Sequence, residues 1–183
     1  MAKPKVYVTR RIPQKGIRML ENECEVEVNP EDRPLTREEL LEKVQGRDGI
    51  LCLLTDKIDG EVMDAAGSLK GIANYAVGFD NISVPDASER GIPVSNTPGV
   101  LTDATAEMAW TLLFAVSRRV VEADAHMRSG QWHGWGPLQF LGGDVTGKTL
   151  GVVGAGRIGT AMALKSRGFD MRVLYTDQRR NET

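Results

Sequence analysis

Short apolar runs and helical patterns alternate along the first half of the chain. Runs of β-branched residues or strictly alternating residues predict strands, and apolar residues three or four positions apart predict helices. The expected strands are 5–9, 25–28, 49–54, 71–77 and 92–96, and the expected helices are 13–22, 35–44, 59–67 and 85–91. This alternation predicts a parallel, doubly wound sheet of about five strands, a flavodoxin-like α/β domain over residues 1–100.

The helical segment 35–44 carries a recognisable start signal. Thr36 precedes Glu39 by three residues, which is the spacing of a capping box, and apolar residues at Leu40 and Val44 follow. We therefore expect a helix that begins directly after Thr36.

The pattern changes after residue 100. Residues 101–129 contain neither glycine nor proline, and apolar residues recur at alternating spacings of three and four. This seam consists of Ala106, Ala109, Leu113, Val116, Val120, Ala123 and Met127. Such a heptad pattern predicts one helix of about 25 residues, capped by Asp103 or Thr102. The helix either joins two domains as a core element or meets its copy in a dimer. Different parts of the same helix can serve the two purposes.

A glycine- and tryptophan-rich segment, 128–144, follows this helical pattern. Trp132 and Trp135 are too large to remain in water without a partner surface. We expect them to anchor the segment against the same subunit or another one. Together with the Ala106–Met127 helix, the segment predicts a homodimer.

Composition and charge exclude several classes of protein. The chain has 183 residues and a formal net charge of -2, so it has no general attraction to nucleic acid or to anionic membranes, and we expect neither partner. No apolar segment follows the basic N-terminal residues, and Cys24 and Cys52 lack metal-ligand spacing. The sequence therefore predicts a soluble cytoplasmic protein without a metal site.

The most specific motif begins at residue 149. An apolar run, 149–153, leads directly into Gly154, Gly156 and Gly159, and a helical pattern follows. Gly154 permits the tight turn out of a strand, Gly156 lets a pyrophosphate approach the backbone, and Gly159 lets the helix pack closely on the strand. The first turn of the helix offers unpaired N–H groups to phosphates. Because strand and helix flank the glycines in register, residues 101–183 predict the first part of a Rossmann dinucleotide-binding domain.

A carboxylate at the end of the next expected strand, 171–175, bears on the choice of cofactor. Asp177 lies 18 residues beyond Gly159, where it can accept hydrogen bonds from the adenosine ribose hydroxyls. A carboxylate there repels a 2′-phosphate, which favours NAD over NADP. NADP stays open, because Arg179 and Arg180 can contact a 2′-phosphate if Asp177 turns aside.

Three segments together resemble one known family. They are "VGFDN" at 77–81, "NTPGVLTDATAE" at 96–107 and "GAGRIG" at 154–159. The chain resembles the D-isomer-specific 2-hydroxyacid dehydrogenases, and within them the glyoxylate/hydroxypyruvate reductases. The resemblance covers essentially all 183 residues. It implies a substrate domain followed by a dinucleotide-binding domain with the active cleft between them, and NAD(P)-dependent reduction of a small 2-keto acid.

The resemblance also implies roles for individual residues. The backbone N–H groups of Val77 and Gly78 hold the substrate carboxylate, and Leu53 lines the substrate pocket. Thr105 lies near the cofactor, and Asp177 lies at the ribose. The pyrophosphate contacts come from the backbone of Ala155, Gly156, Arg157 and Ile158.

The catalytic arginine, glutamate and histidine of the family lie downstream of the glycine motif, beyond residue 183. Neither His126 nor His133 matches the catalytic histidine, so we assign no catalytic residue within this sequence. One hypothesis is therefore the N-terminal part of such a dehydrogenase, with weak or no turnover by these residues alone. The alternative is a catalytically inactive truncated paralogue that binds a nucleotide or a dimerising partner. A related enzyme acting on phosphoglycerate or formate is a third possibility.

Overall fold

The computed structural model describes residues 2–182, which form two compact units that divide after Pro98. The strands of the first unit are β1 (Lys5–Val8), β2 (Glu25–Val28), β3 (Gly49–Cys52), β4 (Gly71–Asn74) and β5 (Val94–Ser95). Its helices are α1 (Gln14–Glu23), α2 (Arg37–Lys43), α3 (Gly60–Ala66) and α4 (Val84–Glu89). All strands are parallel in the order β2-β1-β3-β4-β5, which is the flavodoxin order. The predicted doubly wound α/β fold is confirmed.

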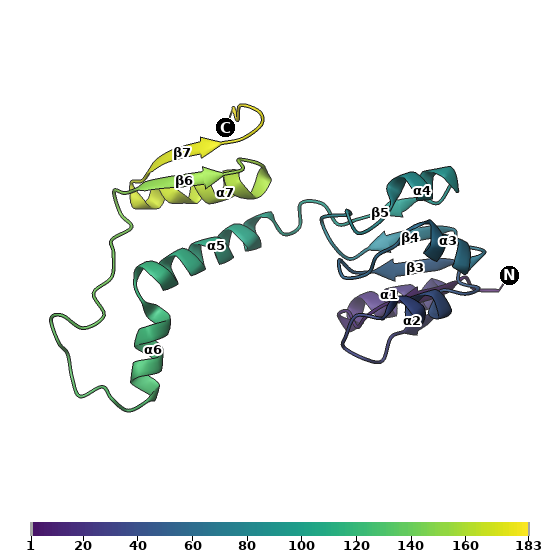
Figure 1. Ribbon diagram of the computed structural model, residues 1–183, viewed down its shortest axis with the longest axis horizontal. Helices are drawn as coiled ribbons and strands as arrows, with labels where there is room; N and C mark the ends of the chain where they lie inside the picture. Colours follow the sequence, from purple (N-terminus) through teal and green to yellow (C-terminus); the bar gives the residue numbers. More distant parts are fainter. Residues whose placement is uncertain (1, 183) are drawn as a thin grey trace. The chain divides into compact units, whose positions relative to one another are not determined.

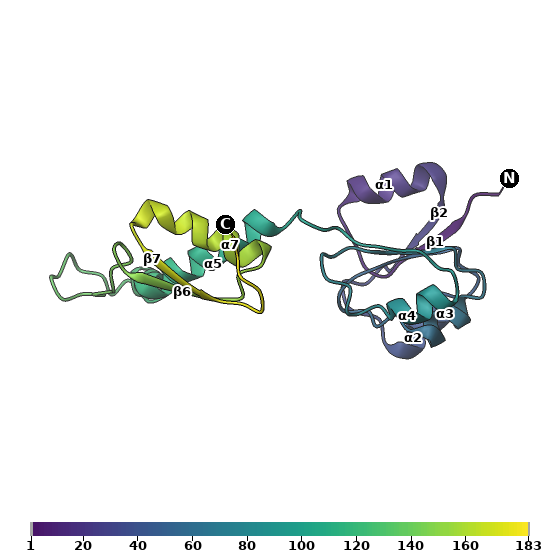
Figure 2. The same ribbon diagram turned by 90° about the horizontal axis from the view of Figure 1, so that it is seen from above.

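Helices cover both faces of this sheet. Helix α1 lies on one face, and α2, α3 and α4 lie on the other (Figure 2). The main core is formed by Leu40, Val44, Ile50, Cys52, Ile58, Val62, Met63, Ala66, Ile72, Ile82, Ala87 and Ile92. Burying a side chain of this size contributes about 1.5–3 kcal/mol, so this layer is the main source of stability for the first unit.

Strand β3 ends two residues earlier than its apolar run predicts. The chain turns at Leu53, whose N–H donates to the Asp56 carboxylate at 2.8 Å, while the Asp56 N–H donates to the Leu53 carbonyl at 3.0 Å. A side-chain contact thus closes the turn and stops the ladder. The turn brings Leu53 and the residues after it to the carboxyl edge of the sheet, where ligands bind in this class of fold.

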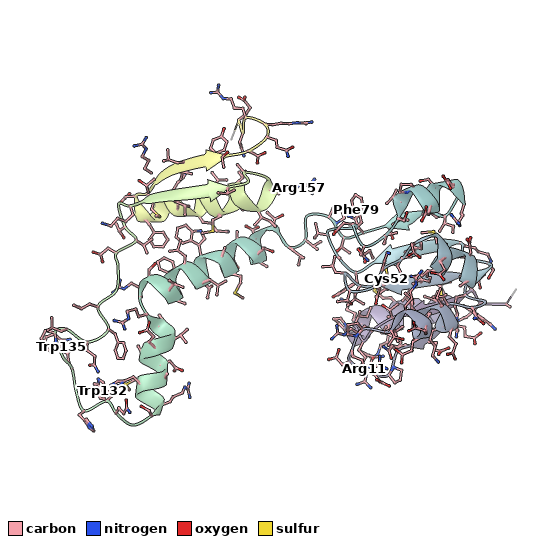
Figure 3. All side chains as sticks on the ribbon, viewed as in Figure 1. Arg11, Cys52, Phe79, Trp132, Trp135 and Arg157 are labelled. Atoms are coloured by element: carbon pink, nitrogen blue, oxygen red, sulfur yellow. The ribbon has the colours of Figure 1, made fainter. Side chains whose placement is uncertain are left out.

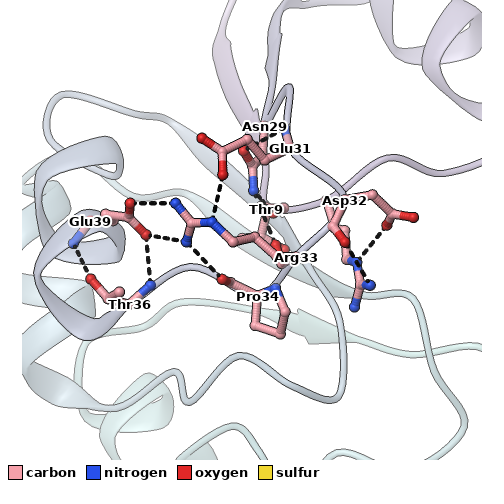
Figure 4. Close-up of polar contacts among 9 residues, drawn as sticks. Thr9, Asn29, Glu31, Asp32, Arg33, Pro34, Thr36 and Glu39 are labelled. Carbon is pink, nitrogen blue, oxygen red and sulfur yellow. Dashed lines mark hydrogen bonds and ion pairs between the residues drawn. The ribbon is translucent and has the colours of Figure 1, made fainter.

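Helix α2 begins with the predicted capping box (Figure 4). The Glu39 N–H donates to the Thr36 hydroxyl at 3.3 Å, and the Thr36 N–H donates to the Glu39 carboxylate at 2.8 Å. Arg33 adds two hydrogen bonds of 2.7 Å to the same carboxylate. The Arg33 guanidinium and the Thr36 N–H lower the pKa of Glu39 to about 2. Nearby, the Asn29 amide donates to the Thr9 carbonyl at 3.0 Å and holds the loop after β2.

The second unit is a βαβ element preceded by two helices. Its elements are α5 (Thr102–Ser117), α6 (Val120–Arg128), β6 (Thr149–Val153), α7 (Arg157–Lys165), a 3₁₀ turn (Ser166–Phe169) and β7 (Arg172–Thr176). Strands β6 and β7 pair in parallel, and α5 lies beside α7 (Figure 1). Trp110 of α5 packs on Phe114 and Phe169, and its indole N–H donates to the Met162 carbonyl at 3.1 Å. This aromatic cluster joins the helices to the strands.

The prediction of one helix across 101–129 is wrong. Helix α5 stops at Ser117, and Arg119 takes a left-handed conformation (φ 54°) before α6 begins at an angle to it (Figure 1). The helix breaks where a residue outside it takes up a helix carbonyl. The Gly143 N–H donates a hydrogen bond of 2.8 Å to the Ser117 carbonyl. The Arg119 guanidinium then lies 5.4 Å from the Phe140 ring centre. The apolar spacing runs through this break, and no local residue marks it.

The expected caps of α5 are also wrong. The helix begins after Leu101, and neither Thr102 nor Asp103 accepts a capping hydrogen bond. Asp103 instead pairs with Lys165 of α7 at 2.9 Å. This ion pair adds to the contact between the two helices.

The face of β6 and β7 away from α7 is open among residues 2–182. Val153 is 91% exposed and Leu174 is 50% exposed. Strand β6 pairs only with β7 within this range. Across the same residues, none of the helices combines the length and the apolar character that a bilayer span requires.

Candidate functional site

The glycine motif forms the turn between β6 and α7. Gly154 adopts φ 91°, a conformation that glycine tolerates and other residues rarely adopt. A Cβ atom on Gly159 would lie 2.0 Å from the Gly154 carbonyl oxygen, so only glycine lets the helix approach the strand this closely. A Cβ atom on Gly156 would meet nothing within 4 Å, so this position opens to solvent. The two glycines therefore serve different purposes, packing at Gly159 and access at Gly156.

A depression of about 500 Å³ lies at the N-terminus of α7. Its lining residues are Thr102, Ala155, Gly156, Arg157, Thr160 and Asn181. The N–H groups of Gly156, Arg157 and Ile158 have no protein acceptor among the described residues. Unpaired N–H groups and the positive end of the helix dipole favour an anion at this place. The depression therefore suits a phosphate group.

Asp177 lies directly beside this loop. Its carboxylate accepts a hydrogen bond from the Ala155 N–H at 2.6 Å. The Asn181 amide donates to the Ala155 carbonyl at 2.8 Å and to the Thr160 hydroxyl at 2.6 Å. These contacts tie the segment after β7 to the glycine loop. The exposed carboxylate retains lone pairs for ribose hydroxyls, so the residues present fit the ADP half of a dinucleotide.

Thr105 and Arg180, which the sequence also linked to the cofactor, do not line this depression. Thr105 lies on the exposed side of α5 and does not line the depression, whereas Thr102, one turn earlier, does. Arg180 lies 4.0 Å from Glu182. Sequence reasoning missed Thr102, Thr160 and Asn181, although Thr160 follows the last glycine of the motif directly.

The predicted substrate residues lie together at the carboxyl edge of the first unit's sheet. The Asn81 amide donates to the carbonyls of Leu53 at 3.1 Å and Asp56 at 3.0 Å, and so links the turn after β3 to the loop after β4. The Asn74 amide donates to the Asn81 side chain at 3.0 Å. Phe79, on the same loop, is 52% exposed (Figure 3). This edge brings Leu53 and the Val77–Gly78 pair into one cluster.

The Val77–Gly78 backbone presents unused donors. Among residues 2–182, the N–H groups of Val77 and Gly78 have no acceptor. Two neighbouring N–H groups can bind both oxygens of a carboxylate with charge-assisted hydrogen bonds. The geometry therefore allows a carboxylate site here.

Buried polar groups also hold the turn after β3 at the carboxyl edge of the first unit's sheet. The Asp56 carboxylate is buried and accepts hydrogen bonds from the Thr9 hydroxyl and the Leu53 N–H. Burial, with a smaller effect of Asp56, raises the pKa of the Cys52 thiol to about 12. Cys52 is therefore a neutral thiol at physiological pH and a poor nucleophile.

Neither histidine lies in the cluster around the glycine loop, which belongs to the same unit. The His126 ring packs on Phe140 and lies 3.0 Å from the Gln139 amide nitrogen, and His133 is exposed on the loop after α6. His126 lines a pocket together with Trp132 and Trp135, and His133 directly follows Trp132 in the sequence. Both tryptophans lie on the loop after α6 (Figure 3). Within the described residues of the second unit, the glycine loop thus offers ligand-binding groups but has no imidazole beside it.

Known proteins give a consistent picture. The family model "D-isomer specific 2-hydroxyacid dehydrogenase, catalytic domain" matches residues 6–182. The glyoxylate reductase of Thermococcus gammatolerans is 55% identical over 182 residues, covering 97% of this chain and 54% of the relative. That of Thermococcus kodakarensis is 56% identical, covering 97% of this chain and 55% of the relative. The chain thus spans about half the length of the curated relatives it matches.

Solved structures support the fold as well as the family. A protein from Thermus thermophilus superposes with a TM-score of 0.94 at 47% identity, covering 98% of this chain and 58% of that one. A protein from Polaromonas, described as a putative D-isomer specific 2-hydroxyacid dehydrogenase, NAD-binding, superposes with a TM-score of 0.93 at 39% identity, covering 98% of this chain and 57% of that one. The chain belongs to the D-isomer-specific 2-hydroxyacid dehydrogenase family.

Proposed function

We propose that the protein reduces a small 2-keto acid, glyoxylate or hydroxypyruvate, to the 2-hydroxy acid with NADH. The observation that carries the proposal is the geometry of the glycine loop. Gly159 packs against the Gly154 carbonyl, and the Asp177 carboxylate accepts a hydrogen bond from the Ala155 N–H at 2.6 Å. The relatives named glyoxylate reductase, at 55% and 56% identity, support this substrate class.

The substrate carboxylate binds to the N–H groups of Val77 and Gly78 in this proposal. Leu53 is half-buried beside them, and Leu54 and Phe79 present exposed apolar surface on the same edge. A Cβ atom on Gly78 would lie 3.2 Å from the Asp80 carboxylate and 3.9 Å from the Leu54 side chain, so both side chains lie beside the loop. The apolar side chains of Leu54 and Phe79 offer contact surface for the carbon atoms of a small acid.

The dinucleotide binds through the second unit in this proposal. The bound nicotinamide supplies the hydride for the keto carbon. The N–H groups of Gly156, Arg157 and Ile158 bind the pyrophosphate, and Asp177 accepts hydrogen bonds from the ribose. The hydrogen bond from Ala155 holds the Asp177 carboxylate at the site, where it repels a 2′-phosphate, which supports NAD over NADP.

We also propose that the protein is a homodimer. The apolar surface of α5, α6 and the loop after them is exposed, with Val116 at 77%, Val121 at 72%, Trp135 at 84% and Leu138 at 81%. Trp132 is 48% exposed. Exposed apolar groups gathered in one region are typical of a protein interface. They support docking of residues 128–144, which we call the tryptophan loop, on a second subunit.

Two assays on the full-length protein test the function. Fluorescence titration measures the Kd for NADH and for NADPH, and absorbance at the NADH band follows turnover with glyoxylate, hydroxypyruvate and pyruvate. We expect tighter binding of NADH and the highest kcat/KM with glyoxylate or hydroxypyruvate. Binding of NADH without turnover of any keto acid would contradict the proposal and favour a catalytically inactive, nucleotide-binding paralogue.

A further inference from the structure

Three consecutive carbonyl groups in the loop after β4 are each held by a hydrogen bond from a neighbouring segment. The Thr97 N–H donates to Ala76 at 2.9 Å, the Asn96 side-chain amide to Val77 at 2.7 Å, and the Asn74 side-chain amide to Gly78 at 2.8 Å. These bonds use the carbonyls of the loop and leave the N–H groups of Val77 and Gly78 without a protein acceptor in the described part of the chain. The loop is therefore fixed through one set of its polar groups only.

The bond from Asn96 determines the direction of one particular donor. The Val77 carbonyl and the Gly78 N–H belong to the same planar trans peptide unit and point in opposite directions. When the Asn96 amide holds the Val77 carbonyl, the Gly78 N–H must face the other way. The same reasoning applies to Thr97, which holds the Ala76 carbonyl and so sets the direction of the Val77 N–H.

A glycine on one side of this peptide unit makes such an anchor necessary. Glycine has more backbone freedom than any other residue, so the peptide between Val77 and Gly78 can rotate easily if nothing holds it. Asn96 follows β5 directly, and β5 pairs with β4 through Ala73 and Ser95. The anchor therefore comes from the rigid sheet rather than from the loop itself.

We propose that Asn96 is a positioning residue for the substrate carboxylate: its side-chain amide holds the Val77 carbonyl and thereby aims the Gly78 N–H at the substrate. Asn96 does not itself contact the substrate in this proposal. The inference rests on the proposed function, in which Val77 and Gly78 bind the carboxylate. In this inference Asn96, a side chain outside the loop, sets the orientation of the Gly78 N–H, which binds the substrate carboxylate.

Two substitutions in the full-length protein separate hydrogen bonding from shape. Asn96→Ala removes the amide, and Asn96→Leu keeps a side chain of similar size and no charge that cannot donate to the Val77 carbonyl. We expect both to raise the KM for glyoxylate by about tenfold or more, with kcat changed by less than about threefold, since the lost bond acts on binding of the carboxylate. The Kd of oxalate, an unreactive dicarboxylate probe, should rise in parallel in calorimetry, while the Kd of NADH stays unchanged.

Asn29→Ala is the matched control. The Asn29 amide also binds backbone carbonyls of the first unit, those of Thr9 at 3.0 Å and Arg33 at 3.3 Å, but away from the loop after β4. We expect this variant to lower Tm and to leave the KM for glyoxylate and the Kd of oxalate unchanged.

The outcomes distinguish the two proposals. An unchanged KM and oxalate Kd in Asn96→Leu, or an equal weakening of oxalate and NADH binding, overturns the positioning role. If the wild-type protein reduces no keto acid but binds oxalate, and Asn96→Leu loses that binding, the proposed function fails while the positioning role of Asn96 stands.

Discussion

At the scale of single residues, Gly156 and Gly159 differ in what a methyl group would meet. A methyl group on Gly159 would overlap the Gly154 carbonyl at 2.0 Å, whereas one on Gly156 would point into open space. We expect Gly159→Ala to reduce the free energy of unfolding by about 1–3 kcal/mol or more, because the helix must move off the strand. Gly156→Ala should keep the wild-type Tm and weaken NADH binding, since the methyl group occupies the approach of the pyrophosphate.

Thermal unfolding and NADH fluorescence titration of the two variants check this difference. Each variant serves as the control for the other, because the substitution is the same and the positions are three residues apart. A Gly159→Ala protein with wild-type Tm would show that α7 does not need the close approach to β6.

A second effect at the residue scale concerns Glu39 and pH. Because Arg33 and the Thr36 N–H lower the folded-state pKa of Glu39 to about 2 from a reference of 4.5, its contribution to stability is present above pH 4.5 and is lost as the pH falls toward 2. We expect Glu39→Gln to lower the urea midpoint at pH 7, and to lower it by a smaller amount at pH 3. Glu42→Gln is the control, because Glu42 lies on the same helix outside the capping box. A pH-independent difference between wild type and Glu39→Gln would contradict this account.

At the scale of elements, the sequence predicted the ends of a strand where residues next to it in the sequence determine them. Strand β6 begins and ends at the predicted residues, because the apolar run meets a charged residue at Lys148 and a glycine at Gly154. Strand β3 is shorter than its apolar run, because the Asp56 carboxylate closes a turn at Leu53. The difference between the two strands is a tertiary contact that periodicity does not contain.

The same limit applies to the candidate site. The glycine motif was predictable because its spacing reflects a local strand–turn–helix geometry. Asn81 and Asn96 lie in the family motifs and Asn74 lies outside them, but the sequence assigned none of the three a role, because their carbonyl partners lie up to 28 residues away and no spacing pattern connects them. Polar groups that shape a loop through its backbone leave no periodic signal in the sequence.

The break between α5 and α6 gives a prediction at the element scale. A Cβ atom on Gly142 would lie 2.3 Å from the Ser117 carbonyl oxygen, whereas one on Gly143 would meet nothing within 4 Å. We expect Gly142→Ala to push the loop away from the break and to reduce the free energy of unfolding by about 1–3 kcal/mol. Gly143→Ala, the control, should change it by less than about 0.5 kcal/mol. Faster hydrogen exchange of the Gly143 amide in Gly142→Ala would report the lost bond to Ser117, and equal Tm values for the two variants would contradict the prediction.

At the scale of the whole molecule, the two proposed ligand-binding surfaces belong to separate units. The loop around Val77 and Gly78 is supported by the core of the first unit, and the glycine loop is supported by the Trp110 cluster of the second. Substitutions in one surface should therefore leave binding at the other intact. This independence is the reason why oxalate and NADH serve as separate probes for Asn96 and Gly156.

The tryptophan loop gives the last prediction, which concerns assembly. Trp135 is 84% exposed and Trp132 is 48% exposed, so a dimer that covers them gains far more buried apolar area than the single chain provides. We expect the full-length protein to be a dimer at micromolar concentration, and the double variant Trp132→Ala/Trp135→Ala to shift it toward monomer in light scattering after size exclusion. Met19→Ala is the control, because Met19 is 65% exposed on α1 of the other unit and should not affect assembly. A wild-type monomer, or a double variant that stays as dimeric as the Met19 control, would rule out this loop as the interface.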